Sequence, residues 1–231
     1  MKSLYPLCLL AFSACAALAQ APATYYSRTV FSDDFSGDGF GKRWGHYKSA
    51  SVVKDGVLTG ITPEGSDHSA VDNVVIPAEK DLEVSVKFRY LSDKAKSFNL
   101  WFDDKGFKGS HAGHICNVNV SPTAVSIGDA KTGNFRNDIY EKKKTPGGLS
   151  AEDKIFLKTK NASFPVKLSL QDWHTLEAHT KGDQIDVSID GKAVGSFQSE
   201  GIAHDTKTLV SLTTNQVDVQ YDDFAIKAPA K

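Results

Sequence analysis

Hydrophobic and polar residues alternate along much of this chain, most regularly in the segment 82–91. In the order Leu-Glu-Val-Ser-Val-Lys-Phe-Arg-Tyr-Leu, every second residue from Leu82 to Tyr90 is apolar, and those between them are polar or charged. Successive side chains of a β-strand point to opposite sides, so a period of two is typical of a strand with one buried face. The segment predicts a long strand at the centre of the fold.

The rest of the chain repeats this alternation in shorter segments that end at turn-forming residues. Asp55-Gly56 and Asp190-Gly191 each separate two such segments, as in β-hairpins. Pro77 is expected to close the strand before it. Besides 82–91, we expect strands at 29–35, 51–54, 57–60, 70–76, 97–102, 114–120, 123–128, 165–170, 173–180, 184–189, 192–197, 209–213 and 217–226.

Helix is expected at one place within this series. Residues 129–163 form the longest irregular stretch, and inside it Ser150-Ala-Glu-Asp153 has the form of a capping box. This predicts a short helix near 151–159. Many short strands with almost no helix indicate an all-β fold, a two-sheet antiparallel β-sandwich of the jelly-roll type. No linker or internal repeat divides the chain, so we expect a single domain over 29–227.

The N-terminus has the pattern of a signal peptide over 1–19, followed by a leader at 20–28. Lys2 supplies a positive start, residues 7–18 are mostly apolar and form a signal helix, and Ala17-Leu18-Ala19 fits a small-x-small cleavage site. A lipoprotein alternative stays open, because Phe12-Ser13-Ala14-Cys15 is similar to a lipobox. The pattern predicts an exported protein, periplasmic or extracellular, with no membrane span.

Export leaves Cys116 as the single cysteine, so no intramolecular disulfide can form. It alternates with Asn117 and Asn119, and we expect a buried, inert thiol. A domain of this size without disulfides indicates a bacterial source. Loss of Lys2 leaves 26 of the 27 basic residues against 28 acidic ones, a net charge of −2, which favours neither nucleic acid nor an anionic membrane as partner. We expect a monomer.

Several short motifs resemble the concanavalin A-like (laminin G-like) jelly rolls, and most closely the 3-keto-disaccharide hydrolase-like, or family 16 glycoside hydrolase-like, domain. They include Phe31-Ser-Asp-Asp-Phe35, Asp172-Trp173-His174-Thr175-Leu176 and Tyr221-Asp-Asp-Phe-Ala-Ile226. Trp44 and the segments 53–58, 87–89 and 187–194 complete the resemblance, which covers about 30–226. It implies the jelly-roll fold and a carbohydrate partner, and for some members a glycan-cleaving activity.

Three carboxylates at alternate positions, Glu79, Asp81 and Glu83, suggest a catalytic strand. They resemble the Glu-x-Asp-x-Glu strand of retaining family 16 glycosidases, in which two carboxyls stand about 5–5.5 Å apart. The flanks oppose this interpretation. Lys80 would face the core, Pro77 places Glu79 at a strand end, and the face continues with further charges. We favour an exposed strand end.

Two aspartate pairs near the ends of the domain suggest a calcium site. Asp33-Asp34 and Asp222-Asp223 each precede a phenylalanine, and the first and last strands of this fold often lie side by side. Carboxylates are preferred ligands of Ca²⁺, and many domains of this kind hold a structural calcium ion there. We assign Asp34 and Asp222 as its candidate ligands and expect no other cofactor; the alternative is that they cap strands and turns.

The region 111–138 is richest in groups that bind or process sugars. Carboxylates, amides and arginine make paired contacts with hydroxyls, and an aromatic ring stacks under a pyranose. We assign catalytic roles to His114, Asp129, Arg136 and Asp138. We assign substrate binding to Asn99, Trp101, His111, Lys131, Asn137 and His204. Ordinary turn polarity explains the same residues equally well.

Three functions therefore stay open. The first is glycan binding on the concave face of a secreted β-sandwich. The second is an enzyme, a glycoside hydrolase or lyase that uses acid and base groups of 111–138. The third is a purely structural module. Convergence of His114, Asp129, Arg136 and Asp138 in one pocket would favour the enzyme, and their scatter would weaken it.

Overall fold

The computed structural model describes residues 25–94, 96–215 and 218–231. The expected signal peptide at 1–19 and the first part of the leader lie outside the described residues. The end of the leader packs on the domain, because Tyr26 is buried and its hydroxyl donates to the Thr180 carbonyl at 2.9 Å. No helix in the described part of the chain is long and apolar enough to cross a membrane.

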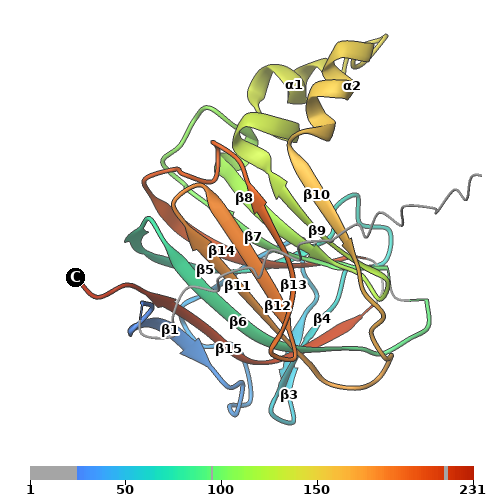
Figure 1. Cartoon of the computed structure of the whole chain (residues 1–231). Helices are drawn as coiled ribbons and strands as arrows, with labels where there is room; N and C mark the ends of the chain where they lie inside the picture. Colours follow the sequence, from blue (N-terminus) through green and yellow to red (C-terminus); the bar gives the residue numbers. More distant parts are fainter. Residues whose placement is uncertain (1–24, 95, 216–217) are drawn as a thin grey trace, which may run out of the picture.

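Two antiparallel sheets form a sandwich, as the alternation predicted (Figure 1). We call the eight-stranded one sheet A. Strand β1 (Arg28–Asp33) pairs with β15 in this sheet. The other strands, in spatial order, are β13 (Lys192–Gln198), β12 (Gln184–Ile189), β11 (His174–Lys181), β6 (Leu82–Tyr90), β15 (Val219–Ala228), β4 (Val57–Gly60) and β3 (Val52–Lys54).

We call the seven-stranded sheet sheet B. In spatial order its strands are β10 (Asn161–Pro165), β9 (Ala124–Asp129), β8 (His114–Val120), β7 (Phe98–Asp103), β14 (Lys207–Thr214), β5 (Ala70–Glu79) and β2 (Trp44–Tyr47). The chain changes sheets repeatedly, so strands far apart in sequence become neighbours: β14 lies between β5 and β7.

The core lies between the sheets and is built from the apolar side of each strand. Phe88 of the central strand packs on Phe98 of the other sheet with ring centroids 4.9 Å apart, and Phe98 meets Tyr221 at 5.3 Å. Buried hydroxyls have partners, since Tyr90 donates to the Val120 carbonyl at 2.8 Å. Cys116 is fully buried, and this burial raises the pKa of its thiol to about 12, as expected for an inert thiol.

Two expected strand limits were wrong. Pro77 does not end β5, which continues to Glu79; the ladder to β14 shifts register between Leu209 and Lys207, and a proline is tolerated at such an irregularity. The strand expected at 165–170 lies earlier, at 161–165, because those residues pair with β9. The hairpin turn at Asp55-Gly56 is confirmed, with φ values of 54° and 77°.

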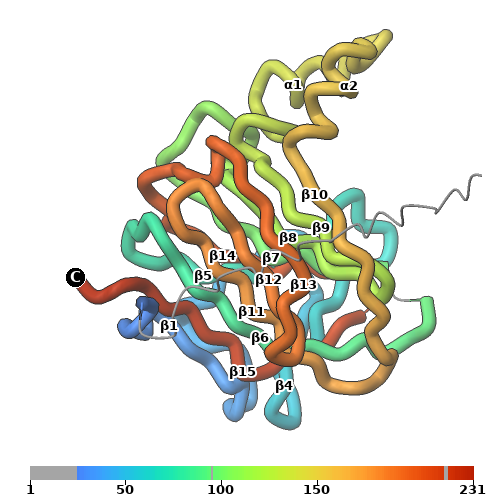
Figure 2. The backbone as a smooth tube through the Cα atoms, in the orientation of Figure 1, coloured from blue at the N-terminus to red at the C-terminus, as the bar shows by residue number. Residues whose placement is uncertain are grey.

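The stretch 129–163 forms a helical insertion that extends beyond one end of sheet B (Figures 1 and 2). It contains the turn η2 (Ala130–Asn134), helix α1 (Asn137–Lys142) and helix α2 (Ala151–Lys158). The capping box is present: Ser150 accepts from the backbone N–H of Asp153, whose side chain accepts from the N–H of Ser150. Helix α1 was not expected.

Candidate functional site

A cleft of about 870 Å³ lies on the outer face of sheet B. Strands β5, β7 and β14 form its floor, and the loops around 67, 111 and 135 together with α1 form its walls. Its lining residues are Tyr47, Asp67, His68, Ser69, Val71, Asn73, Asn99, Trp101, Asp103, His111, Ala112, His114, Phe135, Tyr140, Leu209, Ser211, Thr213 and Asn215. The floor comes from the polar side of the strands, which the alternation in β7 predicted.

Strand register brings the floor residues into rows across the sheet. Trp101 lies opposite Ser211 of β14, and Ser211 lies opposite Asn73 of β5. Two residues along β7 from Trp101, Asn99 lies opposite Thr213. The Trp101 row therefore carries a hydroxyl and an amide next to an aromatic ring, and the Asn99 row adds a second amide and hydroxyl. These are the groups that hold sugar hydroxyls and the apolar face of a sugar ring.

Asp103 and His114 form the main ionisable pair of the cleft. Nδ1 of His114 lies 2.7 Å from Oδ1 of Asp103, on paired positions of β7 and β8. Burial raises the pKa of Asp103, and the hydrogen bond and positive charge of His114 oppose this shift. In the described part of the chain no residue hydrogen-bonds Nε2 of His114, so this nitrogen can meet a ligand in the cleft.

Aromatic rings build one wall around this pair. Trp101 lies against His114 with centroids 4.3 Å apart, and Phe135 contacts both rings at 5.2 and 4.6 Å. His111 stacks on Tyr140 of α1 at 3.8 Å with an interplanar angle of 11°. Burial, followed by the nearby His114 and Lys144 charges, lowers the pKa of His111 and favours its neutral form.

Side-chain amides cover the floor beside the tryptophan. Oδ1 of Asn99 accepts hydrogen bonds from Asn117 at 3.1 Å and from Asn119 at 3.0 Å. Gly45 leaves room for Asn73, since a Cβ at position 45 would lie 2.8 Å from the Asn73 amide oxygen. The amide ladder is therefore held in place before any ligand arrives, which reduces the entropy lost on binding.

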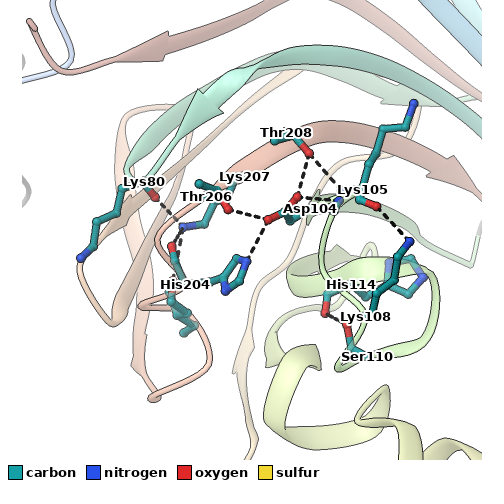
Figure 3. Close-up of polar contacts among 12 residues, drawn as sticks. Lys80, Asp104, Lys105, Lys108, Ser110, His114, His204, Thr206, Lys207 and Thr208 are labelled. Atoms are coloured by element: carbon teal, nitrogen blue, oxygen red, sulfur yellow. Dashed lines mark hydrogen bonds and ion pairs between the residues drawn. The ribbon is translucent and has the colours of Figure 1, made fainter.

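Asp104, the residue after Asp103, anchors the loops that carry the walls (Figure 3). It accepts hydrogen bonds from Thr206, from His204 at 3.0 Å and from Thr208 at 3.2 Å, as well as from the Gly106 backbone at 2.8 Å. Burial favours the protonated carboxyl, but these hydrogen bonds outweigh it and lower the pKa to about 2. The network joins the 104–113 loop to the start of β14.

The four expected catalytic residues do not converge. His114 lies in the cleft, whereas Asp129 is buried outside its lining and accepts from Thr132, Ser199 and the Gly201 backbone. All these donors are internal, so Asp129 holds the insertion in place. Arg136 and Asp138 pair with each other at 2.6 Å on the outside of the insertion, and neither lines the cleft.

The six expected binding residues divide evenly. Asn99, Trp101 and His111 line the cleft. The other three lie outside its lining and have structural contacts. Lys131 stands over the Phe107 ring at 5.3 Å, Asn137 donates to the Lys108 carbonyl at 2.7 Å, and His204 pairs with Asp104.

The alternate carboxylates do not share a strand. Glu79 ends β5 in sheet B, Glu83 lies in β6 of sheet A, and Asp81 is in the turn between them. Each has its own partners: Arg28 for Glu79 at 2.7 Å, Tyr25 and the Gly182 backbone for Asp81, and His179 and Lys227 for Glu83. Their spacing therefore reflects a crossover between sheets.

The calcium expectation depended on the first and last strands being neighbours, and β1 does pair with β15. The carboxylates there already have other partners, however. Asp34 accepts from Ser36, and Asp223 pairs with Lys87 at 2.6 Å. Among the described residues no group of three His, Cys, Asp or Glu side chains is arranged to hold a metal. Calcium binding through Asp34 and Asp222 stays a prediction, which a calcium titration tests.

Sequence reasoning missed several residues of the cleft, above all Asp103 and Tyr140. Asp103 shares the strand face of Asn99 and Trp101, so the alternation signal could have included it. Tyr140 belongs to a short helix without a sequence-visible cap, and Ser211 comes from a strand about a hundred residues away in the chain. Only the strand order shows that these positions meet.

Comparisons with known proteins give the fold. No protein-family model matches the chain, and no curated protein is similar to it in sequence. Its structure is similar to a non-specific endo-β-1,3(4)-glucanase from family GH16, with TM-score 0.61 and 12% identity over 90% of this chain and 93% of that one. The fold is a concanavalin A-like jelly roll.

Two further jelly-roll neighbours differ in length. The carbohydrate-binding module CBM66 from Bacillus subtilis matches with TM-score 0.54 and 12% identity over 80% of this chain and 96% of the module. A sialidase matches with TM-score 0.61 and 14% identity over 87% of this chain. The chain spans only 18% of the length of that sialidase. The jelly roll therefore occurs both in enzymes and in a binding module.

Proposed function

We propose that this protein binds carbohydrate in the cleft on sheet B. The observation that carries the proposal is the combination, on one rigid floor, of Trp101 with a ladder of amides and hydroxyls. Sugars present apolar ring faces and many hydroxyls, so they need this pairing of a stacking ring with convergent hydrogen-bonding groups. The expected export from residues 1–19 is part of the proposal and would place the cleft outside the cytoplasm.

Binding is supported over glycosidase chemistry by the carboxylates of the cleft. Retaining hydrolysis needs two carboxyls about 5–5.5 Å apart, and the inverting route needs two at a larger separation. The cleft is lined by Asp67 and Asp103; Asp67 forms an exposed pair with Lys48 at 2.8 Å, and Asp103 is buried behind His114. Neither is placed as a free acid beside a sugar ring.

The test is affinity electrophoresis with a panel of soluble polysaccharides that includes β-1,3-glucan, mixed-linkage β-glucan, a galactan and a mucin-type glycan. Retarded migration in at least one gel, abolished by Trp101→Ala, is expected. Trp173→Ala is the matched control, because Trp173 is 36% exposed but lies just before β11, in the other sheet. Unchanged migration of the wild type in every gel would contradict binding.

A second candidate, cleavage, is favoured by the His114–Asp103 pair. A buried carboxylate hydrogen-bonded to Nδ1 holds a histidine in one orientation and leaves Nε2 as a base. On a sugar with a ring ketone, Nε2 would take a proton from the carbon beside the carbonyl. The freed electron pair forms a C=C bond as the glycosidic C–O bond breaks, and the leaving oxygen takes a proton to become an alcohol.

Turnover and binding can be separated with one variant. Incubation with a 3-keto-disaccharide should give the ultraviolet absorbance of the conjugated enone if the chain is a lyase. His114→Gln should then lower the rate by about a hundredfold or more and retain binding. Binding without any product from the wild type would reject the enzyme and leave the binding function intact.

A further inference from the structure

A second set of chemically competent side chains lies at the edge of sheet A, in a pocket of about 440 Å³. Ser169, His174 and Asp190 line it and form a hydrogen-bonded chain. Oγ of Ser169 is 3.2 Å from Nε2 of His174, and Nδ1 of the same ring is 2.8 Å from Oδ2 of Asp190. We propose that these three residues form a nucleophilic triad that hydrolyses esters of short acyl groups.

The exposure of Ser169 and His174 matches these roles. Ser169 is exposed, so a substrate carbonyl can reach its hydroxyl, whereas His174 is 8% exposed and is shielded from water. Burial favours protonation of Asp190, but its hydrogen bonds with His174 and the Thr175 backbone outweigh this and lower its pKa. An ionised Asp190 holds the proton of the neutral imidazole on Nδ1 and leaves Nε2 to accept from the serine.

Backbone contacts fix all three members. His174 begins β11 and Asp190 occupies the turn between β12 and β13, where its backbone N–H donates to the Thr175 carbonyl at 2.9 Å. Ser169 lies between two tethered positions: the N–H of Leu168 donates to Pro122 and that of Gln171 to Tyr90. The serine is therefore held near the histidine without a ligand, as an active nucleophile requires.

The backbone carbonyl of Ser169 can stabilise His174 when its imidazole is protonated during the reaction. It lies 3.0 Å from Nε2 of His174 and can accept a hydrogen bond only after that nitrogen gains a proton. The imidazolium formed during catalysis would thus be held by this carbonyl and by Asp190 together. This contact stabilises the developing charge.

The rest of the pocket indicates the substrate. The apolar side chains of Val166, Leu168, Ile189 and Val194 line the same pocket and suit a short acyl chain. Lys167 and Lys192 also line the pocket, and the charge of Lys192 contributes to lowering the pKa of Asp190. Their charges can stabilise the oxyanion that forms on the ester carbonyl.

The reaction balances with water as the only co-reactant. Oγ of Ser169 attacks the ester carbonyl carbon and passes its proton to Nε2 of His174. The tetrahedral intermediate collapses, the ester C–O bond breaks, and the leaving alcohol takes that proton. Water then gives a proton to Nε2 and attacks the acyl-serine, whose C–O bond breaks to release the acid while Oγ of Ser169 regains a proton.

The experiment uses the whole chain with a fluorophosphonate probe and with 4-nitrophenyl acetate and butyrate. We expect the probe to add to Ser169, located by peptide mass, and Ser169→Ala to abolish both labelling and turnover. Asp190→Asn keeps the shape of the turn and is expected to lower the rate by at least about a hundredfold, because it favours the wrong imidazole tautomer. Ser163→Ala, an exposed serine on β10, is the matched control.

The proposal is overturned if the wild type takes up no probe, or if Ser169→Ala hydrolyses the esters as fast as the wild type. Thermal unfolding of each variant shows that it is folded, and the exposed position of Ser169 makes its replacement harmless to the core. Carbohydrate binding is independent of this result, since the cleft lies on the other sheet.

Discussion

Two adjacent aspartates, Asp103 and Asp104, each pair with a histidine, and their surroundings give them opposite properties. Among the described residues the Asp103 carboxyl has one side-chain partner, His114, and burial raises its pKa. Asp104 accepts four hydrogen bonds, including one from His204, and its pKa is lowered to about 2. The first pair faces the cleft and the second joins two loops behind it.

Both aspartates contact a histidine, so that contact alone does not set their roles. The number of hydrogen-bond donors to each carboxylate distinguishes the pair that can react, Asp103–His114, from the pair that only holds loops together, Asp104–His204. A carboxylate that accepts hydrogen bonds from threonines and the backbone stays ionised at neutral pH. Its histidine partner therefore has a structural role. A buried carboxylate with one partner responds to that partner's proton. His114 is therefore the histidine that can act on a ligand, and His204 is structural.

The largest expected effect is on the anchor. Asp104→Ala removes the acceptor of four hydrogen bonds and leaves three half-buried side-chain donors unpaired, which should lower the free energy of unfolding by roughly 3 kcal/mol. Urea denaturation followed by tryptophan fluorescence measures it. Thr208→Ala, which removes one donor only, should cost about 1 kcal/mol. Equal losses for both variants would contradict the anchor role.

The contribution of Asp104 to stability should be lost at low pH. The folded state binds the Asp104 proton more weakly than the unfolded chain does, so its stability contribution is present above pH 4 and is lost as the pH falls through about 2. A shift from 3.8 to about 2 corresponds to about 2 kcal/mol. Asp104→Asn should therefore lose less stability than the wild type between pH 5 and 2, measured by urea titrations at each pH.

The contribution of Asp103 to the free energy of unfolding should change with pH in the opposite direction. Because burial raises its pKa in the folded state, its ionisation reduces stability as the pH rises through that pKa. Asp103→Asn removes this term, so its unfolding free energy should increase more steeply with pH than that of the wild type. At neutral pH we expect a stability change of about 1 kcal/mol or less, since one hydrogen bond changes. A pH profile parallel to the wild type would reject the assignment.

The sequence predicted the sheets far better than the cleft, for a physical reason. Alternation is a local signal, and it located strands such as 82–90 and 114–120 and the outward direction of Asn99 and Trp101. Whether Asp129 faces the same space depends on strand order and on the 199–201 loop, which are not local. The alternate carboxylates at 79–83 suggested a single catalytic strand, because the alternation of residue types does not show where the chain passes from one sheet to the other.

The smallest expected effect concerns the wall that α1 and α2 support. Ser150→Ala removes the cap of α2 and should lower the unfolding free energy by about 0.5 kcal/mol, because this helix end is exposed. The floor of the cleft does not depend on that cap, so glycan binding should be unchanged. A large loss of binding would instead show that the insertion, and not the Trp101 floor, carries the site.

The most direct measurement is an NMR titration of the three tryptophan indole N–H signals with a soluble glycan that retards the protein. Trp101 lies in the cleft, Trp44 is buried with its N–H donating to Asp33 at 2.8 Å, and Trp173 lies beside Arg89 at the other sheet. Binding in the cleft predicts that the Trp101 signal shifts with saturation while the other two stay fixed. A shift confined to Trp173, or none, would contradict the account.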